Sequence, residues 1–363
     1  MSSFSERPVL VFWEMTRACL LSCVHCRASA MSKPLPGELS KEEGHELLNR
    51  IASFGRPTPT VVFTGGDPLM RNDLFDQFQH AAHVGLRFAV SPAVTERLNH
   101  GTLSKFKEAG VSSISVSLDG AAPTTHDYIR SVAGTFQRSV AAIRDSVITG
   151  LNPQVNTTVM IENCGELAKI FHLVKSIGVK TWEVFFLVNL GRGAYIDALS
   201  PSQHEDVCNF LYEASHYGVT IRCVEAPFIR RIVKSRSNCP NYRGGSLYRK
   251  LHAELISYEG PPTERSTIAP RGTLDGDGII FVGYDGTISP GGLLPVRLGN
   301  VREHDLVRVY RENELLNSIR LRSFTGRCGV CEFKEICGGS RARAASATGS
   351  PLASDAACLL VSA

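Results

Sequence analysis

The strongest constraint on the fold is a regular alternation of short β-rich runs with amphipathic helices from Val9 to about Val188. The expected strands are Leu10–Glu14, Thr60–Thr64, Arg87–Ser91, Ser112–Leu118, Gln154–Met160 and Thr181–Val188. Helices are expected near residues 40–53, 72–84, 101–109, 136–149, 164–177 and 202–217. Strands joined by helical crossovers form parallel sheets. Six such units, short of the eight of a full barrel, predict an α/β fold with a partial (β/α)6 TIM-like barrel.

Local signals fix where several of these helices begin and end. Ser40 with Glu43 three residues later forms a capping box at the first helix. Gly110, Gly150 and Gly178 stand where helices are expected to stop. In a barrel of this kind the chemistry lies on loops that follow the carboxyl ends of the strands.

Length and composition set the domain organisation. A chain of 363 residues with 43% hydrophobic and 20% charged residues is an ordinary globular protein. We expect a barrel over 1–235, a linker or lid over 236–275, and a small cysteine-rich domain over 276–363. The net charge of +4 permits an anionic substrate but does not indicate a nucleic-acid polymer. Met1–Pro8 lacks the features of a signal peptide and no apolar run spans a membrane, so a cytoplasmic location without membrane contact is expected.

A cysteine-rich loop follows the first expected strand. Cys19, Cys23 and Cys26 stand in a C-x3-C-x2-C pattern. Three thiolates can bind three irons of a [4Fe–4S] cube and leave the fourth iron open, whereas such clusters normally take four thiolates. The alternative is a zinc site completed by His25 or by a distant cysteine.

Three further loops carry candidate binding residues. The second strand ends in Gly65-Gly66-Asp67-Pro68, where glycines allow close approach of a ligand and Asp67 can accept from an ammonium group. The same four residues also suit a plain turn. After the fourth strand, Ser117 and Arg130 could hold a carboxylate through a hydroxyl bond and a charge-assisted pair. Arg192, after the sixth strand, would suit an anionic substrate at the barrel mouth.

A second cysteine group lies near the carboxyl terminus. Residues 278–289 contain an Asp-Gly turn between two β runs, which predicts a hairpin, and a short helix is expected from about Asp305 to Arg320. The four cysteines that follow are Cys328, Cys331, Cys337 and Cys358. Their thiolates could close a site for zinc or for a second iron–sulfur cluster, and spacing alone does not decide between them. Cys239 is a spare thiol in the 236–275 segment and is not expected to be a ligand.

Together these motifs resemble the radical S-adenosylmethionine (SAM) superfamily. The cysteine loop is similar to that family's cluster motif, and Gly65-Gly66-Asp67-Pro68 resembles its Gly-Gly-Glu-Pro motif with Asp in place of Glu. Ser117-Leu-Asp-Gly and His126-Asp-x-x-Arg130 also look like family patterns around SAM. The hairpin, Leu298-Gly-Asn-Val-Arg and the second cysteine group resemble a SPASM/twitch-type extension, closest to proteins of haem and haem d1 maturation.

The resemblance implies a set of cofactors and contacts. Cys19, Cys23 and Cys26 would hold a SAM-binding [4Fe–4S] cluster, and electron transfer to SAM would give a 5′-deoxyadenosyl radical that takes a hydrogen atom from the substrate. No protein side chain is assigned as catalytic. An auxiliary [4Fe–4S] cluster would lie on the second cysteine group, and flavodoxin or ferredoxin would supply electrons. The residues that would contact SAM are His25, Gly65, Gly66, Asp67, Pro68, Ser117, Arg130 and Asn156.

Two departures from the tetrapyrrole-modifying relatives bear on the substrate. Those proteins carry cysteine in or beside the hairpin and after Cys337-Gly-Gly, where this chain has Ser289 and Ser340. We therefore expect two cubes in all, with the auxiliary cube moving electrons or donating sulfur. A small anionic metabolite, a nucleotide or sugar in natural-product biosynthesis, is the expected substrate because it fits the mild positive charge and the arginine at the barrel mouth. Tetrapyrrole modification and ribosomal peptide maturation are the enzymatic alternatives. A zinc or iron–sulfur scaffold or redox sensor is the non-enzymatic one.

Overall fold

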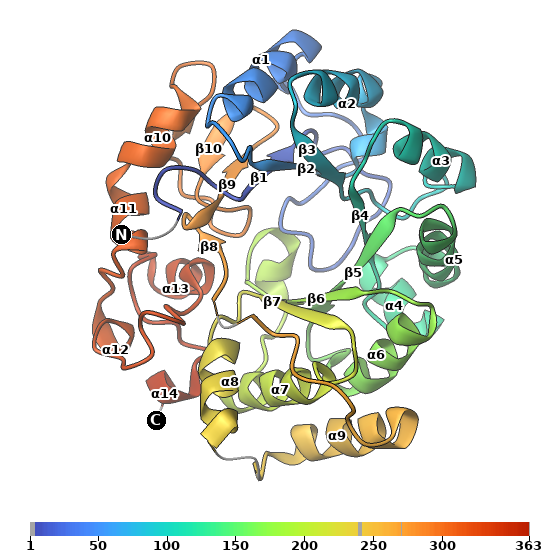
Figure 1. The fold of residues 1–363 in the computed structure, drawn as a ribbon, viewed down its shortest axis with the longest axis vertical. Helices are drawn as coiled ribbons and strands as arrows, with labels where there is room; N and C mark the ends of the chain where they lie inside the picture. Colours follow the sequence, from blue (N-terminus) through green and yellow to red (C-terminus); the bar gives the residue numbers. More distant parts are fainter. Residues whose placement is uncertain (1–3, 239–241, 270, 363) are drawn as a thin grey trace.

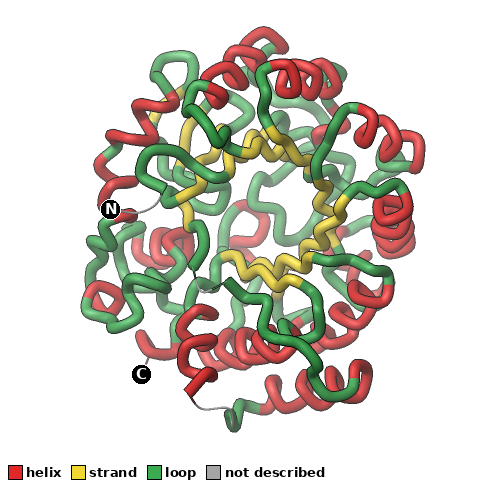
Figure 2. The backbone as a smooth tube through the Cα atoms, in the orientation of Figure 1, coloured by secondary structure: helices red, strands yellow, loops and turns green. Residues whose placement is uncertain are grey.

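The computed structural model describes residues 4–238, 242–269 and 271–362. Its strands form one mixed sheet that curves around a centre, with most helices outside it (Figures 1 and 2). β7 stands at one end of the strand order and β11 at the other, so the barrel is partial, as predicted. Parallel strands follow one another in chain order as β1 (Leu10–Glu14), β2 (Thr60–Thr64), β3 (Arg87–Val90), β4 (Ser113–Ser117), β5 (Asn152–Val159), β6 (Thr181–Phe186) and β7 (Thr220–Val224).

The sheet extends further than predicted at both ends. β7, which pairs with β6 in parallel, was not among the expected strands. Beyond β1, β9 (Gly278–Val282) pairs with β1 in parallel, and β10 (Thr287–Ser289) pairs with β9 in antiparallel fashion. The predicted hairpin is therefore confirmed, and its first strand also belongs to the barrel sheet. The two remaining strands are short: β8 (Leu274–Asp275) lies beside β9, and β11 (Gly299–Asn300) lies beside β10.

The predicted helices lie within a few residues of their expected positions, and α4 was not predicted. The Ser40 capping box is present, and Gly110, Gly150 and Gly178 all have positive φ after their helices, which confirms these signals. Short 3-10 helices cover Pro68–Met70, Cys164–Glu166 and Gly191–Tyr195. The barrel helices are α1 (Lys41–Ala52), α2 (Leu74–His83), α3 (His100–Glu108), α4 (Pro123–Arg130), α5 (Thr135–Ile148), α6 (Leu167–Ser176) and α7 (Pro201–Ala214).

The second half of the chain contains more helices than predicted. The 236–275 segment, which was expected to be a linker or lid, holds the end of α8 (Ile229–Asn238) and all of α9 (Ser246–Glu259), which packs against α6 and α7. The helix expected near 305–320 is two helices, because the Asn313 side chain caps a new start. Cys239 lies outside the described residues. The last helices are α10 (Leu306–Glu312), α11 (Glu314–Arg320), α12 (Gly326–Gly329), α13 (Arg341–Thr348) and α14 (Leu359–Ser362).

An aromatic core holds the first strands against their helices. The Trp13 and Phe63 ring centroids lie 5.6 Å apart, and Phe78 meets Phe63 edge-on at 5.0 Å. All three side chains are fully buried. Edge-on pairs of this kind add to the stabilisation from burial alone. This packing fixes the ends of β1 and β2, from which the loops of the candidate site start. No helix among the residues described is both long and apolar enough to cross a membrane.

Candidate radical and auxiliary cluster sites

The cysteine loop folds back beside the end of β1. Cys19 N donates to Met31 O at 2.7 Å and Met31 N donates to Arg17 O at 3.0 Å, so the loop closes on itself. Its three cysteines belong to one small apolar cluster with Leu21 and Ala30. Burial raises the pKa of the Cys19 thiol to about 12, so a bound metal is needed to hold it as a thiolate.

Each of the three sulfurs has an N–H donor. Leu21 N lies 3.3 Å from Cys19 Sγ, and Ala30 N lies 3.4 Å from Cys26 Sγ. Arg130 Nη1 lies 3.6 Å from Cys23 Sγ. Hydrogen bonds to the sulfurs of a cluster help to set its reduction potential. Three thiols in one small apolar cluster, each with a donor, therefore fit an iron–sulfur cluster.

The two glycines after β2 let that loop lie directly against the cysteine loop. Gly66 N donates to Thr16 O and Asp67 N donates to Ala18 O, both at 2.7 Å. A Cβ on Gly65 would stand 2.4 Å from Thr16 O, and one on Gly66 would stand 2.4 Å from Ala18 O. The glycines are thus required for the contact between the two loops, and the N–H groups of Gly66 and Asp67 are already used.

The Asp67 carboxylate is fully buried and bonded within the protein. Oδ1 accepts from Leu69 N at 3.1 Å, which caps the turn that Pro68 begins, and from Ala93 N at 3.3 Å. Oδ2 accepts from Thr95 Oγ1 at 3.4 Å. The structure therefore gives Asp67 a role in joining the loops after β2 and β3, while its contact with a ligand amine stays a proposal.

This arrangement makes stability depend on pH. Burial raises the pKa of the Asp67 carboxyl from 3.8 to about 6. Since the folded protein then binds this proton more tightly than the unfolded chain does, the associated stability is present at low pH and is lost as pH rises through about 6. Between pH ~5 and pH ~7.5, wild type should lose about 1 kcal/mol of unfolding free energy that Asp67→Asn retains.

Urea denaturation of the apoprotein at the two pH values measures this difference. Equal changes in wild type and Asp67→Asn would contradict the assignment. The SAM affinity of the same variant gives a second result. Weakening by about tenfold or more would show that the carboxylate also receives the SAM amine, since losing one hydrogen bond to a charged group has an effect of that size.

Ser117 and Arg130 lie together, while their contact with a carboxylate stays a prediction. Both line a cavity beside Leu21 of the cysteine loop, with an empty volume of about 200 Å³. Arg130 forms a buried ion pair with Asp119, whose Oδ1 accepts from Thr158 N at 2.7 Å. Asp119 stands in the Ser-Leu-Asp-Gly pattern, but its role as the partner of Arg130 was not predicted.

His25 and Asn156 have different surroundings. His25 Nδ1 is buried without a hydrogen-bond partner among the described residues, and burial lowers the pKa of the ring to about 4, so the ring is neutral. The Asn156 amide oxygen accepts from Gln154 Nε2 at 2.9 Å, and the same nitrogen donates to Glu183 Oε2 at 2.8 Å. Asn156 therefore belongs to a polar network across β5 and β6, which the sequence analysis missed.

Arg192 is placed differently from the expectation. Its guanidinium donates to backbone carbonyls of the cysteine loop, so an anionic substrate is not the partner that the structure gives it. An ion pair between Arg27 and Glu14 was not predicted. Arg27 Nη1 lies 3.2 Å from Glu14 Oε1, and this pair joins the residue after Cys26 to the end of β1.

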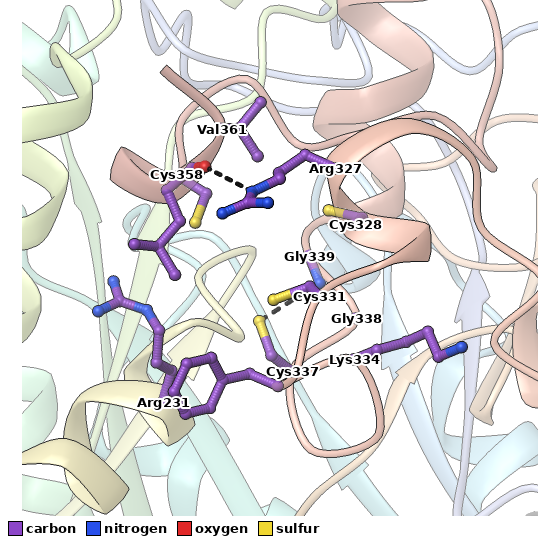
Figure 3. Close-up of a pocket in the computed structure, with 12 residues that line it drawn as sticks. Arg231, Arg327, Cys328, Cys331, Lys334, Cys337, Gly338, Gly339, Cys358 and Val361 are labelled. Carbon is purple, nitrogen blue, oxygen red and sulfur yellow. Dashed lines mark hydrogen bonds between the residues drawn. The ribbon is translucent and has the colours of Figure 1, made fainter. Parts of the chain in front are cut away.

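The second cysteine group surrounds a cavity (Figure 3). Its empty volume is about 390 Å³, including space open to solvent, and all four cysteines line it. Gly339 N donates to Cys337 Sγ at 3.4 Å, and Arg341 Nη2 lies 3.9 Å from Cys328 Sγ. Four thiols around one cavity, two of them with N–H donors, fit a closed iron–sulfur site. Within the described ranges, no group of three or more His, Cys, Asp or Glu is arranged to hold a single metal ion.

The serines at the two departure points are buried and hydrogen-bonded. Ser340 Oγ accepts from Arg343 N at 2.9 Å as the cap of α13, and it also bonds the Glu225 carboxylate. Ser289 Oγ donates to Gly291 O at 3.3 Å. Both hydroxyls therefore take part in the local structure.

A partial barrel with three clustered cysteines after β1 is the scaffold of an iron–sulfur enzyme. The model of the Radical SAM superfamily matches residues 13–174. AdoMet-dependent heme synthase of Methanosarcina barkeri is 34% identical over 361 residues, covering 99% of this chain and 98% of that protein. The protein of the same name from Oleidesulfovibrio alaskensis is 33% identical, and the match covers 96% of this chain and 86% of that protein. Fe-coproporphyrin III synthase of M. barkeri is 30% identical, with 99% and 89% covered.

The chain therefore belongs to the radical SAM superfamily, whose members are enzymes that use a [4Fe–4S] cluster and SAM. The predicted resemblance to haem-maturation members is confirmed by these relatives. Among solved structures, native anSMEcpe with bound AdoMet has a TM-score of 0.67 at 16% identity, covering 97% of this chain and 94% of that chain. This likeness supports the fold.

Proposed function

We propose that this enzyme modifies a side chain of a haem-type tetrapyrrole. The observation that carries the proposal is the similarity over nearly the whole chain to proteins named as haem and Fe-coproporphyrin III synthases. These relatives favour the tetrapyrrole over the nucleotide or sugar expected from the sequence. Ser289 and Ser340 then bear on the number of clusters and not on the substrate class.

Cys19, Cys23 and Cys26 are proposed to hold the SAM-binding cluster. Cluster and SAM, when bound, supply a radical able to take a hydrogen atom from an unreactive carbon. The chain's own residues bind and orient SAM. Ser117 and Arg130 would hold its carboxylate, and the loop from Gly65 to Pro68 would receive its amine. The backbone at His25 would meet the adenine, and Asn156 would meet the ribose.

The second cysteine group is proposed to hold one auxiliary cube through Cys328, Cys331, Cys337 and Cys358. The four thiols line one cavity, and among the described residues no three of them are arranged to hold a single metal ion, which supports a cube over zinc. A cube bound there would supply an electron acceptor for the substrate, and flavodoxin or ferredoxin would supply electrons to the first cluster. Residues 1–235 and 276–363 are proposed as the barrel and auxiliary units, with the β1–β9 pairing between them.

Anaerobic assays with candidate substrates test the proposed function. Reconstituted enzyme with dithionite and SAM should form 5′-deoxyadenosine faster when an iron-coproporphyrin is added, and the tetrapyrrole should change in mass. Nucleotides and nucleotide sugars are the matched comparison. Stimulation by those compounds, with no binding or turnover of the tetrapyrrole, would overturn the proposal.

A further inference from the structure

The loop after β6 holds the cysteine loop through one residue, Arg192. Arg192 N donates to Cys26 O at 3.0 Å, Nε donates to Cys23 O at 2.9 Å, and Nη1 donates to Ala30 O at 2.8 Å. We propose that Arg192 is a positioning residue for the SAM-binding cluster, which keeps the cysteine loop in its ligating shape and places a positive charge beside it. The inference rests on the proposed radical site.

These hydrogen bonds influence the positions of the cysteine sulfur atoms indirectly, because they hold the backbone that carries them. Two of the three proposed ligands, Cys23 and Cys26, have their carbonyl oxygens bonded to Arg192. The third carbonyl belongs to Ala30, whose own N–H lies 3.4 Å from Cys26 Sγ. Arg192 therefore fixes both the residue that carries this thiol and the donor to it. The planar fork of arginine suits such a set of fixed acceptors, and lysine lacks this geometry.

Gly191 brings Arg192 close enough to make these bonds. Its φ is +54°, in the left-handed region, and an added Cβ would stand 2.4 Å from Arg27 O and 2.5 Å from Cys26 O. Only glycine permits this approach without displacing the cysteine loop. Asn189 Nδ2 donates to Ile196 O at 2.8 Å, which closes the loop that carries Arg192.

The loop after β6 also contacts α13, which lies in the carboxyl-terminal segment that carries the second cysteine group. Ser346 Oγ of α13 donates to Asn189 O at 3.2 Å. Leu190 packs against the apolar cluster that contains Val188 and Ala342, and Ala342 also belongs to α13. The loop that carries Arg192 therefore begins at the end of β6 and is packed against α13. Such support suits a residue that positions another loop.

The charge of Arg192 is available to the cluster. Its Nη2 is buried and has no hydrogen-bond partner among the described residues, and its other two guanidinium nitrogens bond neutral carbonyls. A guanidinium stays charged under all ordinary conditions. Because reduction adds negative charge to the cluster, a nearby cation favours the reduced form. Arg192 should therefore raise the reduction potential as well as hold the loop.

Two substitutions separate the effect of the forked geometry of the Arg192 guanidinium from the effect of its positive charge. Arg192→Lys keeps the charge and loses the fork, and Arg192→Gln loses both. On reconstituted protein, both variants should release iron to a chelator about tenfold faster than wild type or more, the effect of losing a bond to a charged group. In an EPR-monitored titration of the SAM-responsive cluster, Arg192→Gln should have the lower reduction potential of the two. Arg308→Gln, an exposed residue of α10, is the matched control and should behave as wild type.

The outcomes distinguish a failure of this inference from a failure of the proposed radical site. If wild type holds no SAM-responsive cluster, the proposed site is wrong and the inference falls with it. If wild type holds one and both Arg192 variants keep the wild-type iron release and potential, the inference alone is wrong. Melting of the cluster-free proteins completes the test. Should both variants fail to fold without the cluster, Arg192 supports the fold in general and the inference is likewise overturned.

Discussion

Replacing Cys19, Cys23 and Cys26 together by alanine is expected to abolish the cleavage of SAM to 5′-deoxyadenosine. The three thiols belong to one small apolar cluster, and no fewer than three are needed to bind a cube that keeps an open iron. The variant should also lose about four irons, the content of one cube. Anaerobic reconstitution, iron analysis and chromatography of the nucleoside products measure both effects.

The loss must come from the cluster and not from the fold. The three side chains form a small cluster of their own, separate from the main core, so the variant should keep the far-ultraviolet circular dichroism of wild type. Cys208, which is fully buried in the main core and is not a proposed ligand, offers a matched control as Cys208→Ala. Cleavage of SAM at an undiminished rate by the triple variant would exclude this loop as the radical site.

Replacing Cys328, Cys331 and Cys337 by alanine is expected to separate SAM cleavage from product formation. Wild type should reconstitute with about eight irons, two cubes of four, and the variant should lose about half, since one remaining thiolate cannot hold a cube. The proposed ligands of the first cluster lie on a different loop, so SAM cleavage should continue. Product should not form, because the substrate would then have no electron acceptor.

The state of the iron after turnover distinguishes the two roles of the auxiliary cube. An electron acceptor should support repeated turnover with the iron content unchanged. A sulfur donor would make about one sulfur-bearing product per enzyme and lose its auxiliary cluster in doing so. Wild-type protein that binds about four irons and one zinc would exclude the second cube altogether.

Local patterns predicted the first strands of the barrel well. β1 and β2 begin and end where the sequence indicated, because each is a short apolar run bounded by polar or turn residues. The pairing of β9 with β1 was not predicted, since it joins residues far apart in the chain. α9 was missed because the Pro, Gly and Ser around it dominate the segment, although Tyr248, Leu251 and Leu255 form its buried face.

The candidate site shows the same division between local and tertiary information. The sequence motifs singled out Ser117 and Arg130, and in the structure both line one cavity beside the cysteine loop. The hydrogen bonds of Asp67 and Arg192 depend on which loops lie beside these residues. These bonds cannot be predicted from the neighbouring residues in the sequence. A charged residue in a loop suggested a ligand contact in both cases, whereas the structure shows bonds to the backbone of adjacent loops.

Deuterium transfer from a labelled tetrapyrrole tests the central claim most directly. An iron-coproporphyrin deuterated along its side chains would be incubated anaerobically with reconstituted enzyme, dithionite and SAM, and the 5′-deoxyadenosine would be analysed by mass spectrometry. A radical SAM enzyme that abstracts a side-chain hydrogen should move deuterium into the 5′-deoxyadenosine, with a matching change in the tetrapyrrole. Formation of 5′-deoxyadenosine without deuterium, beside an unchanged tetrapyrrole, would contradict the account.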